Sequence, residues 1–464
     1  MGIEHHTGNP TLAPPGTPRL VEGTELIGEY QGSGFAEPTY LARRDDGQVL
    51  QLSRLVYLLA TLVDGHRDRD ELAAAFGAEL DREVSVEQVA FLLDDLLRPA
   101  GLVTDDAVPG SAAGGPGATP PDADGPSAEP APADRVTRPD PLLMLKYRAG
   151  LISERRVWTI AGVFRPLFHG PVVAVMLAAF VLLDILIVAG GALGRVVSAA
   201  DAFIDRPGLT LFVLALIVAA GGFHECGHVA ACRYGGARPG VMGIGLYLVW
   251  PAFYSTVTDA YRLDRGARLR VDLGGVYFNA IFLTGLGAAY LLTGSPWLLV
   301  ALVVMHIETL WQFLPSVRLD GYYILADLVG VPDLFARMGP VLRSALPGRS
   351  THPRVAELKP WCRRIVTLWV ALVIPCLVYW VVAFIVLAPR VLPAAWSAVR
   401  TLIDAVAADI QNAHVAAATL GIVNLLLLVL PYVGLALVAG HLARGLHHSA
   451  VRAYRARRPK HDGT

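Results

Sequence analysis

The chain has 464 residues, of which 54% are apolar and only 17% are charged. Soluble globular chains are usually about 45–50% apolar and about 25% charged, so this composition indicates a membrane protein with a soluble part and excludes disordered and collagen-like chains. The net charge of −1 hides an asymmetry, because residues 1–140 carry 24 Asp/Glu and 10 Lys/Arg whereas residues 141–464 carry 16 and 29. An acidic soluble half does not suit nucleic acid, whose binding depends on Lys and Arg.

The N-terminal third of the chain predicts one small folded domain between two flexible segments. Residues 1–38 are rich in Gly, Pro and Thr, and we expect them to be flexible, with no signal peptide. Residues 39–52 predict two short strands around a turn sequence at 45–47. Three amphipathic helices follow, and each is preceded by a residue that caps helices well: Ser53, Asp68 and Ser85. Residues 39–104 therefore predict a winged-helix-like α+β domain.

The rest of the chain predicts a linker and a membrane domain. Residues 105–141 consist mainly of Pro, Ala, Gly, Ser and Asp, which is typical of a flexible linker. From residue 142 onward, apolar runs reach the roughly 20 residues that a helix needs to cross a bilayer. About six transmembrane helices are predicted, at about 171–192, 209–232, 272–293, 296–314, 365–388 and 416–442. The expected fold class is thus mainly α, with a polytopic membrane domain at 142–464.

Basic residues give the expected orientation of these helices, because Lys and Arg concentrate in cytoplasmic loops. With the N-terminus inside, the cytoplasmic segments hold 25 Lys/Arg and the opposite segments hold 4, namely Arg195, Arg206, Arg390 and Arg400. We therefore expect a multi-pass protein of the cell membrane with both termini in the cytoplasm.

The strongest chemical signal is His224-Glu225-Cys226-Gly227-His228, at the cytoplasmic end of the second predicted span. Residues four apart lie on one face of a helix, so the two imidazoles can occupy two corners of a tetrahedral Zn²⁺ site. Glu225 is placed to act as a general base on a zinc-bound water. The alternative interpretation is a cluster of polar side chains at a helix end.

Two histidines and a water leave one protein ligand to be found. Asp320 follows the fourth predicted span within the sequence Leu-Asp-Gly and lies at the same expected depth as His228. Glu308 and His306, inside that span, are the competing donors. The alternative role for Asp320 is to cap the helix that follows it.

These elements resemble the site-2 protease family of intramembrane zinc metalloproteases, peptidase family M50. That family carries HExxH on one core span, Gly-x-x-x-Asn on the next, and Pro-x-x-x-Leu-Asp-Gly at the end of the third. This chain shows the three elements at 224–228, 275–279 and 315–321, and the resemblance covers about 209–330. The resemblance implies one Zn²⁺ per chain and a set of site residues. These are the ligands His224, His228 and Asp320, the base Glu225, and Asn279 near the substrate.

Two positions depart from the family pattern. Val276 stands where the family usually has Pro, and Gln312 stands where an Asn commonly precedes the last element. Both positions bear on binding of the substrate strand, and neither removes a ligand. For Asn279 the alternative role is a hydrogen bond between helices of the bundle. The resemblance also implies that residues 245–260 form a membrane-embedded strand or hairpin that pairs with an extended substrate, and the alternative is a loop at the membrane interface.

Residues 39–104 resemble the PqqD-like peptide-recognition domains of modified-peptide (RiPP) biosynthesis. The likeness lies chiefly in Leu62-Val63-Asp64-Gly65 and in the closing Gly-Leu-Val at 101–103. Such domains bind the leader of a precursor peptide as an added strand. A generic winged-helix regulatory domain is the alternative.

Together the two resemblances imply a membrane-embedded zinc endopeptidase that hydrolyses a peptide bond near the cytoplasmic side. The expected partners are the lipid bilayer and a peptide or membrane-protein substrate, in the first place a ribosomally made peptide or its leader. Regulated proteolysis of a signalling membrane protein is the second hypothesis. A non-catalytic transport or immunity protein is the third, and the oligomeric state is left open.

Overall fold

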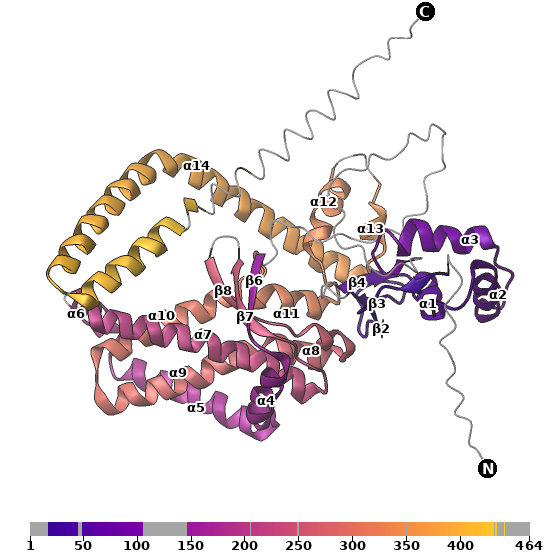
Figure 1. Ribbon diagram of the computed structural model, residues 1–464. Coiled ribbons are helices and arrows are strands. Elements are labelled where there is room, and N and C mark those ends of the chain that lie inside the picture. Colours follow the sequence, from indigo (N-terminus) through magenta and orange to yellow (C-terminus); the bar gives the residue numbers. More distant parts are fainter. Residues whose placement is uncertain are drawn as a thin grey trace, which may run out of the picture. The chain divides into compact units, whose positions relative to one another are not determined.

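The computed structural model describes residues 17–44, 49–104, 146–204, 206–247, 250–346, 348, 350–430, 432–433 and 440. The chain divides into two compact units, whose elements are labelled in Figure 1. The first unit comprises Met1–Arg138 with Ala336–Arg363, and the second comprises Pro139–Phe335 with Arg364–Thr464. The membrane domain expected as one stretch at 142–464 is therefore interrupted, because residues 336–363 pack with the N-terminal unit.

The first unit contains a small antiparallel sheet in the order β2-β3-β4, formed by Glu25–Glu29, Tyr40–Arg43 and Val49–Leu52. Tyr40 lies opposite Leu52, which confirms the two strands predicted within 39–52, while the turn at 45–48 lies outside the described residues. A separate strand pair joins β1 (Arg19–Leu20) to β5 (Val103–Thr104).

Strands β1 and β2 correct the expectation that residues 1–38 are flexible, because residues 19–20 and 25–29 belong to the folded unit. Strand β2 has glutamates at both ends, and polar residues are typical of an edge strand whose outer side meets water. Glu25 of β2 forms an ion pair with Arg43 of β3. Residues 1–16 and the linker predicted at 105–141 lie outside the described residues.

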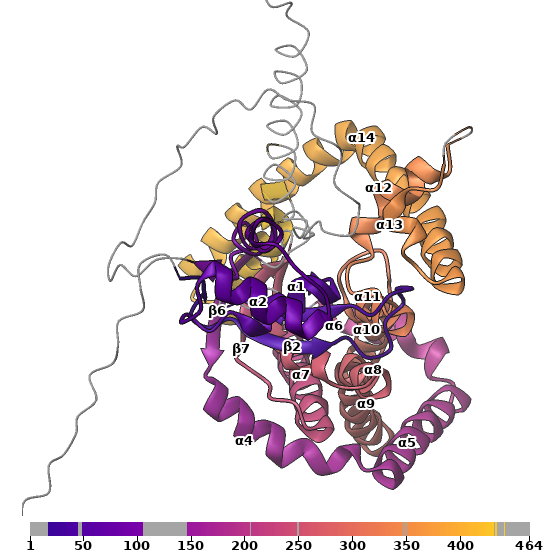
Figure 2. The same ribbon diagram turned by 90° about the vertical axis from the view of Figure 1, so that its right-hand side faces the viewer.

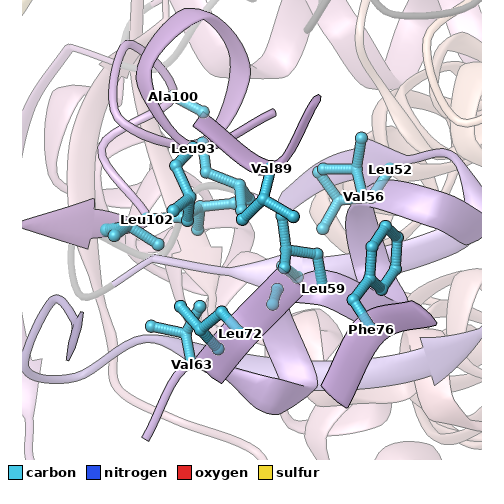
Figure 3. Packing of buried hydrophobic residues seen from close by; sticks show 14 of the residues in the cluster. Leu52, Val56, Leu59, Val63, Leu72, Phe76, Val89, Leu93, Ala100 and Leu102 are labelled. Atoms are coloured by element: carbon cyan, nitrogen blue, oxygen red, sulfur yellow. The ribbon is translucent and has the colours of Figure 1, made fainter. Parts of the chain in front are cut away.

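The three predicted helices and their caps are confirmed as α1 (Arg54–Leu62), α2 (Arg69–Leu80) and α3 (Val86–Phe91). Ser53 accepts a hydrogen bond from the backbone of α1, and Asp68 and Ser85 each form a capping box with the residue three positions on. The chain stays helical through Leu97, and Figure 3 shows how the apolar side chains meet in one core. That core includes Leu59, Leu72, Phe76, Val89 and Leu93.

The second unit is mainly α-helical. Its first long apolar helix is α5 (Gly170–Ala189). Helix α4 (Glu154–Phe164) precedes α5, and helix α6 (Val196–Ile204) follows it. The other helices are α7 (Pro207–Gly235), α8 (Arg265–Asp272), α9 (Gly274–Thr293), α10 (Pro296–Gln312), α11 (Asp320–Val329) and α14 (Pro360–Gln411). Residues 336–363 contribute most of α12 (Phe335–Ser344) and α13 (Pro353–Ala356).

Five helical segments among the described residues are long and apolar enough to cross a membrane. Four of them coincide with the spans predicted at 171–192, 209–232, 272–293 and 365–388. The span predicted at 296–314 is the shorter apolar helix α10, and the span predicted at 416–442 begins as a helix over Val415–Leu430. The fifth long segment, Pro389–Gln411, was not predicted. The chain stays helical there although Pro389 and Pro393 lie inside α14, and apolar spans tolerate proline better than soluble helices do.

A second sheet of order β6-β7-β8 lies in the second unit and joins Lys146–Ile152, Met242–Tyr247 and Trp250–Ser255. Strands β7 and β8 form a hairpin after α7, so of the two structures considered for 245–260 the structure has the hairpin. Strand β6 was not predicted. It pairs with β7, which leaves β8 as an edge strand among the described residues.

Helices α7 and α9 pack closely, beside α10, and Figure 2 shows them from a second direction. A Cβ atom added at Gly227 would lie only 2.2 Å from the carbonyl oxygen of Gly274, so both positions need glycine for the backbones to approach. This close packing brings the start of α9 against the second half of α7.

Candidate metal centre

His224 and His228 project from one face of α7 toward each other. Their Nε2 atoms are 3.1 Å apart, and each residue is only 7% exposed. Two imidazole nitrogens at this distance have no favourable direct contact unless one carries a proton or a third group bridges them. The two Nε2 atoms are thus placed to coordinate one ion between them, and the position of that ion is the shared point of the site.

Asp320 brings a carboxylate to the same point. Its Oδ2 is 3.3 Å from Nε2 of His224, and its Oδ1 is 3.5 Å from Nε2 of His228. In a tetrahedral zinc site with bonds of about 2.0–2.1 Å, neighbouring ligand atoms are about 3.3 Å apart. The 3.1 Å between the two imidazole nitrogens fits one edge of such a tetrahedron, and the 3.3 and 3.5 Å to the two carboxylate oxygens place an oxygen of Asp320 at ligand spacing from each imidazole.

Hydrogen bonds around the three donors also fit a metal ion. Nδ1 of His228 donates to the carbonyl oxygen of Val271, 2.8 Å away, which leaves the lone pair on Nε2 free to coordinate. Oδ2 of Asp320 is buried and has no hydrogen-bond partner in the part of the chain that the structure describes. A buried carboxylate oxygen without a donor is costly, and a cation at the shared point would compensate it.

The local sequence around Asp320 explains how the carboxylate reaches the histidines. Asp320 is the first residue of α11, whose cap position is Leu319 without a side-chain cap bond, so the alternative role as a helix cap is not seen. A Cβ atom at Gly321 would lie 2.2 Å from the carbonyl oxygen of Phe313. The glycine after the aspartate therefore lets α11 start against the end of α10.

Gly275 has a role that the sequence pattern alone does not reveal. A Cβ atom at this position would lie 2.4 Å from Nε2 of His224 and equally close to Nε2 of His228. The missing side chain thus makes the space in which the two imidazoles and any ion between them sit. This is a steric reason for glycine at the start of the Gly-x-x-x-Asn element.

Asn279, one helical turn further on α9, is buried and donates from Nδ2 to Oγ1 of Thr309 at 3.3 Å. This bond joins α9 to α10 and matches the alternative of a hydrogen bond between helices. Its predicted place near the substrate stays a prediction.

Glu225 is half-buried, and its carboxylate lies within 4.8 Å of the donor atoms of His224 and His228. It is therefore within reach of a water at the shared point, and together with the two histidines it forms a group that could hold a metal ion. At this distance its carboxylate can act either as a base or as a ligand.

The competing donors in α10 differ from Asp320 in their surroundings. Nδ1 of His306 donates to the carbonyl of Leu302, and its Nε2 is 3.1 Å from Oδ2 of Asp184 on α5. His306 is thus engaged with α5 instead of the α7 histidines. Glu308 is half-buried and forms no hydrogen bond or ion pair with either imidazole among the described residues.

A buried ion pair beside the centre was missed by the sequence analysis. Nε of Arg268 donates to Oδ1 of Asp327 at 3.1 Å, and Arg268 is only 1% exposed. Breaking such a buried pair is costly because it leaves one charge unpaired. The pair joins α8, which carries the Val271 carbonyl, to α11, which carries Asp320. The sequence offered little signal for it, because Arg268 is one of three arginines in the polar helix α8 (Arg265–Asp272).

The β7–β8 hairpin lies against α7 just before the histidines. A Cβ atom at Gly221 would be 3.1 Å from the ring of Phe253 in β8, so the glycine allows this strand to approach α7. The edge strand β8 therefore runs beside the helical turn that leads to His224.

Comparisons with known proteins give one partial likeness. No family model matches the chain, and no solved structure matches it. Over 112 residues the chain is 31% identical to a Bacillus subtilis (strain 168) protein described as "Putative peptide zinc metalloprotease protein YydH". The matched stretch is 24% of this chain and 44% of that protein, so the chain spans less than half the length of this curated relative. The chain is thus similar, over about a quarter of its length, to a protein described as a zinc metalloprotease.

Proposed function

We propose that this protein is an intramembrane zinc metalloendopeptidase of the site-2 protease type, peptidase family M50, which hydrolyses a peptide bond near the cytoplasmic side of the cell membrane. One observation carries the proposal: the Nε2 atoms of His224 and His228 lie 3.1 Å apart, and the buried carboxylate of Asp320 reaches both, with Oδ2 3.3 Å from His224 and Oδ1 3.5 Å from His228. The apolar helices and the partial likeness to a protein described as a peptide zinc metalloprotease support it.

In this proposal, His224, His228 and Asp320 hold one Zn²⁺. When bound, zinc supplies Lewis-acid polarisation of the scissile carbonyl and makes water a nucleophile at neutral pH. The carboxylate of Glu225 accepts the proton of the attacking water and passes it to the leaving amine. The Val271 carbonyl keeps the imidazole of His228 in the tautomer and orientation that the site needs.

The substrate in this proposal binds in an extended conformation. Strand β8 is an edge strand among the described residues and runs beside the turn of α7 that precedes His224. A peptide added to this edge forms main-chain hydrogen bonds, which place its carbonyl groups in a fixed register. Asn279 would then contact the peptide near the scissile bond.

The N-terminal unit is proposed to select the substrate, in the manner of PqqD-like domains. Its residues 17–104 carry 16 Asp/Glu and 8 Lys/Arg, which favours a basic or amphipathic peptide and a salt-sensitive association. The proposed substrate is therefore a ribosomally made peptide or its leader.

Removal of metal tests the proposed chemistry. The purified protein should contain about one zinc per chain by elemental analysis and should cleave members of a peptide library, read by mass spectrometry. A chelator should abolish both the metal signal and the cleavage, and one equivalent of Zn²⁺ should restore them. Full cleavage by protein free of zinc would contradict the proposal.

Deletion of residues 1–104 tests the selecting role of the N-terminal unit. The deletion should raise KM for the full-length precursor peptide and leave kcat nearly unchanged, because the lost contacts concern binding and not the bond that breaks. A short peptide that carries only the cleavage region should be cut equally well by both forms. Equal kinetics on the precursor would assign this unit a regulatory or assembly role.

A further inference from the structure

Residues 357–359 pair with the loop that joins β2 to β3. The backbone N–H of Ala36 donates to the carbonyl of Glu357 at 2.8 Å, and that of Lys359 donates to the carbonyl of Gly34 at 2.9 Å. Phe35 and Leu358 thereby form an antiparallel bridge, and they are 7% and 2% exposed. Two distant segments are thus joined by main-chain hydrogen bonds around a buried apolar pair.

Side chains reinforce this pairing. Nζ of Lys359 donates to the carbonyl of Ser33 at 2.8 Å. The guanidinium of Arg337 lies over the ring of Phe35, 5.0 Å from its centre, and also 3.3 Å from a carboxylate oxygen of Glu357. Arg337 is only 5% exposed, so its charge is removed from water and matched within the contact.

The two segments are far apart in the sequence. The loop belongs to the N-terminal part of the first unit, whereas residues 336–363 follow α11 in the sequence and end within the first turn of α14. A chance surface contact would not combine main-chain pairing, a buried cation and two buried apolar side chains. The combination is typical of a specific interface.

We propose that residues 336–363 are a built-in docking segment for residues 17–104. Residues 17–104 are then attached to the rest of the chain at two points, through the stretch 105–141 and through the contact of the β2–β3 loop with residues 336–363. The proposal rests on this contact alone, and it holds whether or not the metal centre is a protease.

The docking segment leaves the edges of the sheet free. It binds the loop beyond the closing hydrogen bond between Tyr30 and Thr39, at the end of the β2–β3 hairpin. Among the described residues, β2 and β4 remain the two outer strands of that sheet. A peptide strand could therefore add to an edge while the docking segment stays bound, so docking and peptide recognition are compatible.

A disulfide trap tests the proposal in the full-length protein. The bridge between Phe35 and Leu358 is a pair without direct hydrogen bonds, in which Cα atoms are about 4.5 Å apart, within the roughly 4.4–6.8 Å that a disulfide spans. A protease site is inserted within 105–141, and the variant Phe35→Cys/Leu358→Cys is oxidised mildly and then cut. The two fragments should remain joined on a non-reducing gel and separate after reduction.

Two control variants distinguish the expected disulfide from other cross-links. Phe35→Cys alone detects any pairing with the native cysteines, of which Cys362 is near in sequence to the segment. Phe35→Cys/Arg343→Cys places the second thiol at an exposed position of α12 and should not cross-link. A disulfide that joins two chains, or none at all, would overturn the proposal of docking within one chain.

A second measurement uses the natural residues at the bridge. After the same cut, the N-terminal fragment should co-elute with the rest of the chain on size exclusion. Arg337→Ala/Lys359→Ala should release at least roughly tenfold more fragment, because the cation–π contact of Arg337 with Phe35 and the charged hydrogen bond of Lys359 to Ser33 are lost. Glu79→Ala, an exposed position of α2, should release none. Immediate separation of the fragment with the natural sequence would show that the contact does not hold the unit.

Discussion

Glu225→Gln should abolish peptide hydrolysis and leave about one zinc bound per chain. Glutamine has nearly the same size and shape as glutamate but cannot accept the proton of the attacking water. Loss of a general base costs roughly 10²–10⁴-fold in rate, so kcat should fall by that amount while zinc content stays the same. The measurement is elemental analysis together with single-turnover cleavage of a library-derived peptide.

The matched control for this variant is Glu308→Gln, the same chemical change on α10. It should retain both zinc and activity, because among the described residues the carboxylate that contacts both imidazoles is that of Asp320, and no ion pair joins Glu308 to either of them. If Glu225→Gln instead loses its zinc, Glu225 is a ligand, and the assignment of the three donors has to change. Its carboxylate lies within 4.8 Å of both imidazoles, so the experiment decides between two geometrically accessible roles.

The local parts of the fold could be predicted because they depend on residues close together in the sequence. Ser53, Asp68 and Ser85 each satisfy backbone donors of the next turn, so a few residues determine where a helix starts. His224 and His228 share a helix face for a similar reason. The prediction that these histidines lie close to Asp320 rested on their expected depth in the membrane, which follows from the order of the predicted spans.

Contacts between distant segments could not be predicted in this way. Strand β6 and its partner β7 are separated in the sequence by the four helices α4, α5, α6 and α7, and the composition of β6 does not indicate this pairing. The docking of residues 336–363 on the β2–β3 loop is of the same kind. The span predicted at 365–388 was also too short for α14, which continues through Pro389 and Pro393 to Gln411.

The role of Gly275 shows what only the three-dimensional arrangement reveals. In the sequence, this glycine was one position of a motif, and its missing side chain has no evident purpose. In the structure, it faces the Nε2 atoms of His224 and His228 at a distance that leaves no room for a methyl group. A helix from the next span therefore shapes the centre without contributing a donor atom.

Asp320→Ala should sharply lower zinc occupancy, while the protein keeps its fold. Losing a residue that only orients a ligand typically costs 10–100-fold in metal affinity, so losing a ligand should cost more than about 100-fold. Asp320→Asn removes the charge but keeps the shape at the start of α11, and we expect a similar loss of zinc. Size exclusion and titration with a zinc buffer measure the fold and the affinity on the same samples.

Asp320 and the donors on α10 are alternative third ligands, and the two alternatives predict opposite results for these variants. The carboxylate of Asp320 contacts both imidazoles at 3.3 and 3.5 Å, whereas His306 is bound to Asp184. If Asp320 is the third ligand, its variants lose zinc and Glu308→Gln does not. If Glu308→Gln loses zinc and the Asp320 variants retain it, α10 supplies the ligand. Oδ2 of Asp320 accepts no hydrogen bond from any described residue, which favours the first outcome, because a buried carboxylate oxygen without a donor or a cation would destabilise the fold around it.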